Sequence, residues 1–228
     1  CYPGVDLTRD DILLIHAGVI PATRAARAGE EPPLLRHYRL IDHGSADGVD
    51  GLLTVLGIKY TTARDVAQRT VTHAIARLDG PVVASTTSAR PLMGDVLGDL
   101  ADFRSASFDR YSTHTSPAAI ERLLRLYGGG IDAVLASGEA GPILEGSEDV
   151  LTREIRHVIE TEMPQTLGDL IFRRTGLGSN RPTDPVLLRS CATLMGEAHH
   201  WDSARLEREI EAVTQTSCLW QAATTPDP

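Results

Sequence analysis

The chain contains 228 residues, of which 42% are hydrophobic, so it is long enough to bury a real core in one or two domains. It has no run of about 18 apolar residues, and residues 1–10 lack the apolar centre of a signal peptide, so we expect neither a membrane-spanning helix nor a secretion signal in these residues. A formal net charge of −9 at pH 7 argues against a nucleic-acid partner, because such binding depends on cationic contacts with phosphate. Three cysteines without metal or disulfide spacing fit the reduced thiols of a cytoplasmic protein.

The first 80 residues are predicted to form strands and one helix. The apolar run Asp11–Pro21, which a proline closes, is typical of a buried strand. Leu35–His43 and Leu52–Leu56 flank Gly44–Gly51, whose glycines and aspartates suit a turn. We therefore expect a hairpin with a loose loop.

After Gly57 the apolar residues change to the three-to-four spacing of a helix with one apolar face. The residues with this spacing are Ala63, Val66, Ala67, Val71, Ala74, Ile75 and Leu78. Thr61 or Thr62 is a natural N-cap. The pattern predicts a strand, a tight turn over Gly57–Tyr60 and a helix whose first N–H groups face the turn and can stabilise an anion.

Residues 81–115 are rich in Ser, Thr, Gly and Pro and are predicted to be a linker. Helix signals then follow one another. They are Ser116-Pro117 before a helix ending at Tyr127-Gly128, an apolar stripe from Leu151 to Met163, the segment Thr166–Thr175, and caps at Asp184 and Asp202. The predicted fold class is α+β, with strands and one helix in residues 1–80 and an all-α domain in residues 116–228.

Lys59 stands out from the composition, because it is the only lysine among 22 basic residues. A chain that prefers arginine for surface charge is expected to keep a lysine where a compact ammonium is needed. Lys59 lies where a glycine turn meets a helix N-terminus. The residues alone leave two readings open, a site for a negatively charged group and an ordinary strand-turn-helix.

The segment Gly57-Ile58-Lys59-Tyr60-Thr61-Thr62-Ala63-Arg64 resembles the G-G-K-x-T-T-x-R motif of FAD-dependent glycerol-3-phosphate dehydrogenases and oxidases. Other segments resemble the same family in the same order, and the resemblance covers nearly the whole chain. These segments are Ala17–Pro21, Arg36–Tyr38, Leu167–Thr175 and Trp201–Arg205. No Gly-x-Gly-x-x-Gly follows a strand here, so the resemblance implies that residues 1–80 are the tail of an FAD- and substrate-binding domain whose N-terminal FAD-binding part is missing from this chain.

The resemblance also implies roles for single residues. The stretch Gly57, Ile58, Lys59, Tyr60, Thr61 and Thr62 would approach the isoalloxazine ring of FAD. Lys59 would act in catalysis and, together with Arg36, bind the anionic end of the substrate. The implied reaction is hydride transfer from an alcohol carbon to the flavin, with quinone or oxygen as electron acceptor. Peripheral attachment to the inner face of the membrane is left open.

Two departures from the family pattern bear on the substrate. Ile20 stands where the family's G-V-R-P motif has a substrate-binding arginine, so glycerol 3-phosphate becomes a less secure substrate, unless Arg24 or Arg27 compensates. Ile58 replaces the second glycine of the turn and narrows its backbone freedom. Two alternatives follow: a flavin-dependent enzyme for an unphosphorylated hydroxy acid or alcohol, and a non-enzymatic helical interaction module.

Histidines and charged side chains elsewhere are expected to be structural. His16 and His43 lie in predicted strands, where a histidine can serve as a general base, but a hydrogen-bonded structural role is preferred. His199-His200 lacks a third ligand at metal-site spacing. Asp169, Arg173 and Arg174 have helical spacing for ion pairs within one helix.

Overall fold

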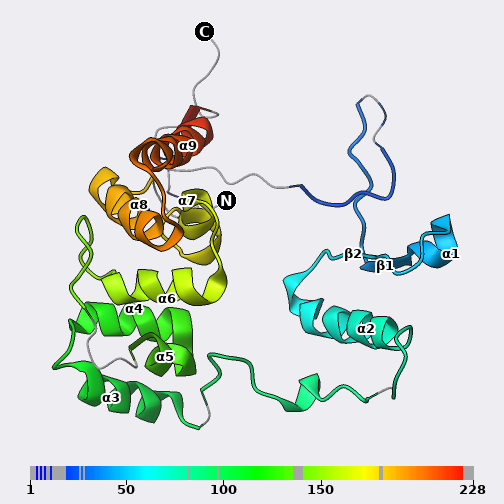
Figure 1. Cartoon of the computed structure of the whole chain (residues 1–228), viewed down its shortest axis with the longest axis horizontal. Coiled ribbons are helices and arrows are strands. Elements are labelled where there is room, and N and C mark those ends of the chain that lie inside the picture. The colour runs from blue at the N-terminus through cyan, green and yellow to red at the C-terminus, as the bar shows by residue number, and fades with distance from the viewer. Residues whose placement is uncertain are drawn as a thin grey trace. The chain divides into compact units, whose positions relative to one another are not determined.

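The computed structural model describes residues 4, 6, 8, 11, 19–25, 27, 29–81, 83–96, 98–135, 141–179 and 182–222, with side chains through residue 217. The chain divides into two compact units (Figure 1). Residues 17–91 form one, called here the hairpin unit, and residues 1–16 with 92–228 form the other, the helical unit. A small sheet in the first and helices in the second confirm the predicted α+β class.

The hairpin unit contains an antiparallel pair of strands, β1 (Arg39–Asp42) and β2 (Leu53–Leu56), with Arg39 opposite Leu56. This pair confirms the predicted hairpin. Its connection is not the loose loop expected, since it begins with the short helix α1 (His43–Asp47). The Asp42 carboxylate caps this helix by accepting a hydrogen bond from the Gly44 N–H at 3.1 Å.

The predicted motif helix is confirmed as α2 (Ala63–Ile75), which follows the 3₁₀ turn η2 (Tyr60–Thr62). Thr62 occupies the N-cap position, but its side chain makes no capping bond; its hydroxyl donates to the Lys59 carbonyl at 3.3 Å instead. Leu35 and Val66 are the buried hydrophobic residues among those described in this unit. Burial inside the hairpin unit therefore contributes little stabilisation.

In the helical unit, α3 (Leu100–Tyr111), α4 (Pro117–Tyr127) and α5 (Ile131–Leu135) pack around one apolar core. The predicted start of α4 is confirmed, because the Ser116 hydroxyl accepts a hydrogen bond from the Ala119 N–H at 3.2 Å. Helix α3 differs from the sequence prediction, because it lies in residues 81–115, where a linker without regular structure was expected. The proposed domain boundaries at residues 80 and 115 stay a prediction.

A second core joins α6 (Thr152–Glu162), α7 (Leu167–Asp169), α8 (Pro185–His199) and α9 (Ser203–Ala222) to the π-helix η5 (Leu170–Arg174). Figure 1 shows α6 between the α3–α5 group and α8, and α6 contacts both α5 and α8. The predicted caps at Asp184 and Asp202 are confirmed, with Asp184 accepting from the Val186 N–H at 2.8 Å and Asp202 from the Arg205 N–H at 2.7 Å. The predicted helix over 166–175 is instead α7 followed by η5.

A buried ion pair links α4 to α6. Glu154 is 0% exposed, and both of its carboxylate oxygens accept hydrogen bonds from the Arg122 guanidinium, with 3.0 Å between Nη2 and Oε1. The Tyr127 hydroxyl lies 3.5 Å from the same Oε1, and burial together with the Glu154 charge raises the pKa of this phenol. The pair places a charged contact between the two cores of the helical unit.

Of the remaining sequence predictions, residues 12–18 of the expected strand Asp11–Pro21 lie outside the described residues, as does His16. Cys191 is a free, buried thiol, and burial raises its pKa to about 12. None of the helices in the described ranges combines the length and the apolar character needed to cross a bilayer.

Gly146 lies where the loop after residue 141 touches the first turn of α8. Its φ is +85°, and an added Cβ would collide with the Leu187 backbone nitrogen and lie 2.9 Å from the Leu187 Cα. We expect Gly146→Ala to lower the free energy of unfolding by about 2–4 kcal/mol, from left-handed strain plus a steric clash with backbone, measured by urea denaturation.

Gly141→Ala is the matched control for this prediction. Gly141 also has a positive φ, +69°, but its nearest neighbour to an added Cβ lies 3.7 Å away. Gly141→Ala should lower the free energy of unfolding by about 1 kcal/mol, from backbone strain alone. Equal losses in the two variants would contradict the predicted clash.

Candidate functional site

Arg36 and Lys59 lie at the same end of the hairpin. Because Arg39 pairs with Leu56, the start of β1 lies beside the finish of β2. Arg36 precedes β1 by three residues, and Lys59 follows β2 by three residues. Two cationic side chains predicted from the sequence are thus carried on neighbouring segments.

The turn from Gly57 to Thr62 presents its backbone and side chains to the surroundings. Gly57, Lys59, Tyr60, Thr61 and Thr62 are exposed, and Ile58 is half-buried. The Lys59 backbone is extended, with φ −141° and ψ 128°. Within the described part of the chain, the Lys59 ammonium has no hydrogen-bond or ion-pair partner, so its charge is free to act on another molecule.

Gly57 and the end of α2 add to this arrangement. A Cβ on Gly57 would meet no described atom within 4 Å, and its φ lies outside the left-handed range. The bare backbone can therefore be approached closely by a flat group. The Thr62 side chain does not cap α2, and the Ala63 N–H donates to the Tyr60 carbonyl of the preceding 3₁₀ turn, so the positive end of the helix dipole lies at the turn.

The opposite end of the hairpin is fixed to α2 by Asp42. The carboxylate contacts the Arg77 guanidinium and accepts a hydrogen bond from His73 Nε2 at 3.0 Å. The hydrogen bond from His73, with a contribution from the Arg77 charge, lowers the pKa of Asp42. This contact holds α2 along the hairpin and thereby sets the position of the turn that carries Lys59.

His43 is held as a structural residue. Its Nδ1 bonds the Asp47 carboxylate, and its Nε2 lies 2.9 Å from the Thr54 hydroxyl. Both ring nitrogens are therefore engaged inside the hairpin. No general-base role is assigned to His43 on this geometry.

Arg64, the last residue of the motif, ties α2 to the segment that follows it. Its Nε donates to the Thr87 hydroxyl at 3.2 Å, and its Nη2 donates to the Arg90 carbonyl. Sequence reasoning gave Arg64 no role, although the motif contains it. The contact links residues more than twenty positions apart, which spacing does not reveal.

The position of the missing family arginine is open to solvent. Ile20 is 60% exposed. Of the two arginines expected to compensate, Arg24 forms an ion pair with Glu30 at 3.1 Å, and Arg27 is exposed. No contact among the described residues places Arg24 or Arg27 beside Ile20.

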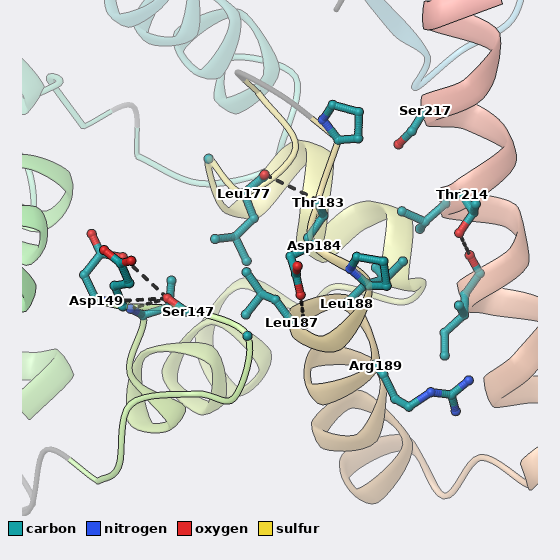
Figure 2. A pocket seen from close by; sticks show the side chains of 18 of the residues that line it. Ser147, Asp149, Leu177, Thr183, Asp184, Leu187, Leu188, Arg189, Thr214 and Ser217 are labelled. Atoms are coloured by element: carbon teal, nitrogen blue, oxygen red, sulfur yellow. Dashed lines mark hydrogen bonds between the residues drawn. The ribbon is translucent and has the colours of Figure 1, made fainter. Parts of the chain in front are cut away.

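The helical unit contains a cavity of about 1370 Å³ between the loop at Ser147, the start of α8 and the face of α9. Figure 2 shows Leu177, Leu187 and Leu188 between the polar groups of the loop and those of α9. Those polar groups have partners: the Ser147 hydroxyl accepts from the Val150 N–H at 2.9 Å, and Arg189 pairs with Glu207 at 2.7 Å. The cavity shows no group prepared for chemistry.

The His199-His200-Trp201 segment forms an aromatic contact. The rings of His199 and Trp201 stack with centroids 6.0 Å apart, and the Arg205 guanidinium lies 4.9 Å from the Trp201 ring centroid. Across the described ranges, no group of three His, Cys, Asp or Glu side chains is placed to hold a metal ion.

Comparison with known proteins gives several related sequences. A glycerol-3-phosphate dehydrogenase of Synechocystis sp. is 28% identical over 217 residues, which cover 92% of this chain and 38% of that protein. A glycerol-3-phosphate dehydrogenase of Mycobacterium leprae is 28% identical over 209 residues, covering 90% and 34%. A D-erythritol 1-phosphate dehydrogenase of Brucella abortus is 29% identical over 178 residues, covering 74% and 34%. The chain spans little more than a third of the length of these relatives.

The family resemblance predicted from the motif is confirmed by these relatives and by a protein-family match. They give no support to the helical interaction module or to an unphosphorylated substrate, since each relative is named for a phosphorylated polyol. The family described as the C-terminal domain of alpha-glycerophosphate oxidase matches residues 85–206, more than half of the chain. The chain belongs to the family of the C-terminal domain of alpha-glycerophosphate oxidase.

Proposed function

We propose that this chain is the C-terminal part of an FAD-dependent dehydrogenase or oxidase that removes hydride from a small phosphorylated polyol. The observation that carries the proposal is the Lys59 turn, with an ammonium that has no partner among the described residues, beside a bare glycine backbone and a helix end without a side-chain cap. The relatives named as dehydrogenases of glycerol 3-phosphate and of D-erythritol 1-phosphate support the substrate class.

The residues of the turn fit a flavin ring. Gly57 offers a backbone without a side chain, Tyr60, Thr61 and Thr62 continue the same exposed surface, and Ile58 is half-buried beside it; these residues would contact the ring. FAD would supply the hydride acceptor. Lys59 and the positive end of α2 would stabilise the negative charge that accumulates on reduction.

Arg36 and Lys59 would bind the anionic end of the substrate. A guanidinium can hold a phosphate through two parallel hydrogen bonds, and an ammonium adds a compact charge beside it. Holding the substrate at this end of the hairpin would orient its alcohol carbon toward the turn. The alcohol proton is not assigned to His43, because both of its ring nitrogens are engaged.

The rest of the enzyme completes the proposal. The N-terminal FAD-binding domain is the expected partner of residues 1–80, and a quinone or oxygen is the expected electron acceptor. The helical unit would serve as scaffold beside that body. A cytoplasmic location, with attachment to the inner membrane face left open, remains part of the proposal.

The test is substrate-driven reduction of the flavin in the complete enzyme, followed by its visible absorbance without oxygen. Glycerol 3-phosphate or another phosphorylated polyol should bleach the flavin. Glycerol and small hydroxy acids should react slower by a factor on the order of 10² or more, because they lack the charge-assisted contacts with Arg36 and Lys59. Equal rates for a hydroxy acid, or purification without FAD, would contradict the proposal.

A further inference from the structure

The helical unit contains a second cavity, of about 700 Å³, which we call the arginine cavity. It lies between the last turn of α4, one face of α6 and the end of η5. Arg125, Arg173 and Arg174 line it, and His157 and Thr161 line it from α6. Cationic side chains from separate segments thus meet around one space.

The two arginines of η5 are each held by one hydrogen bond. Arg174 Nε donates to the Glu162 carbonyl at 2.9 Å, and Arg173 Nη1 donates to the Asp169 carboxylate at 3.0 Å. The Arg173 pair confirms the expected intrahelical contact, whereas Arg174 bonds main chain of α6 instead. A guanidinium has five N–H donors, so both side chains are positioned and still have donors to offer.

Two carboxylates line the cavity, those of Glu154 and Glu162, and a third, Asp169, contacts the lining residue Arg173. Glu154 is neutralised by Arg122 through both oxygens. Asp169 also accepts hydrogen bonds from the Gln165 and Thr166 N–H groups at 3.1 and 3.0 Å. The Glu162 carboxylate lines the cavity and opposes an anion. Three arginines and two glutamates line the cavity, so its lining carries a net positive charge in a chain whose formal charge is −9.

The backbone around the cavity is constrained. A π-helix is rare and recurs at functional sites, and η5 ends with the two arginines, closed by the Thr175 N–H to Leu170 carbonyl bond at 3.0 Å. On the other side, the Gly129 N–H donates to the Gly94 carbonyl at 2.9 Å, and an added Cβ on Gly128 would collide with Gly94. This wall of the cavity is thus formed by close contact between the backbone at Gly94 and the backbone at Gly128 and Gly129.

We propose that the arginine cavity binds a phosphoryl group, either as free phosphate or as the phosphate of a small ester. Two or more fixed guanidinium groups match the oxygens of a dianion, and His157 and Thr161 can add hydrogen bonds. The volume lies in the range of small-molecule sites. The proposal goes beyond the dehydrogenase assignment and uses no residue of the hairpin unit.

The test is isothermal titration of the full chain with inorganic phosphate, glycerol 3-phosphate and, as a neutral control, glycerol. Saturable binding of phosphate or of the ester is expected, and comparison of the two titrations shows whether the cavity takes free phosphate or a phosphate ester. Glycerol should give no saturable binding. Arg173→Gln/Arg174→Gln should weaken binding on the order of 10- to 100-fold. Absence of saturable binding in both phosphoryl arms would overturn the proposal.

Two further variants separate the site from general charge and from folding. Arg205→Gln/Arg208→Gln removes the same net charge from exposed positions on α9 and should leave the affinity unchanged. Glu162→Gln removes the opposing carboxylate and should tighten binding several-fold, while keeping the carbonyl that holds Arg174. An equal loss in the α9 double variant, or no gain in Glu162→Gln, would assign the binding to the surface at large and overturn the proposal.

Discussion

Lys59→Met in the complete enzyme is expected to lower kcat/KM for the phosphorylated polyol by a factor on the order of 10²–10³. Methionine keeps the length and the apolar stem of the side chain but removes its charge. Because the Lys59 ammonium has no partner within the described ranges, its removal breaks no contact there and should leave the fold intact. The loss would therefore report on substrate and flavin contacts.

The measurement is the steady-state rate with a dye as electron acceptor, together with FAD content from absorbance and the melting temperature. Arg69→Met is the matched control, because Arg69 is an exposed cation on α2 that pairs with Asp65 at 3.0 Å. Its rate should equal that of the wild type. Lys59→Arg keeps the charge but not the compact ammonium and should recover only part of the activity. Unchanged turnover in Lys59→Met would remove this residue from the mechanism.

The features that sequence predicted well are those encoded locally. Ser116-Pro117 and Asp184-Pro185 combine a capping side chain with a proline at the first helical position, and both helices begin there. The motif helix followed from the three-to-four apolar spacing after Gly57, and the hairpin from the glycines and aspartates between two strand-like runs. Each of these signals lies within a few residues of the element it predicts.

Features that no local apolar pattern marks were missed. Helix α3 was not predicted because no apolar stripe marks it: its buried face includes Ser107, and Leu100 is 68% exposed. The π-turn of η5 inserts one residue into a segment whose spacing fits an ordinary helix. Ser107 is satisfied by the Phe103 carbonyl at 2.8 Å, a bond that only the folded helix supplies.

The candidate site shows the same division. The residues Gly57 to Thr62 and Arg36 are proposed from a family resemblance, and the hairpin register explains how Arg36 and Lys59 come to one end. The contacts of Asp42 with His73 and Arg77, which hold α2 along the hairpin, join positions about thirty residues apart and carry no periodic signal. Their role became visible only through side-chain geometry.

Glu154→Leu is expected to lower the free energy of unfolding of the helical unit by about 3–5 kcal/mol, because it leaves the largely buried Arg122 guanidinium with only the Asp149 carboxylate, 3.9 Å away. Arg122→Met/Glu154→Leu removes both charges and should recover much of this loss, since well-packed apolar side chains can replace a buried pair. Urea denaturation followed by circular dichroism measures both variants. Arg156→Met, which breaks the exposed pair with Glu197, should cost no more than about 1 kcal/mol. A loss below about 1 kcal/mol in Glu154→Leu, or a double variant that is less stable than the single one, would show that the pair does not hold α4 to α6.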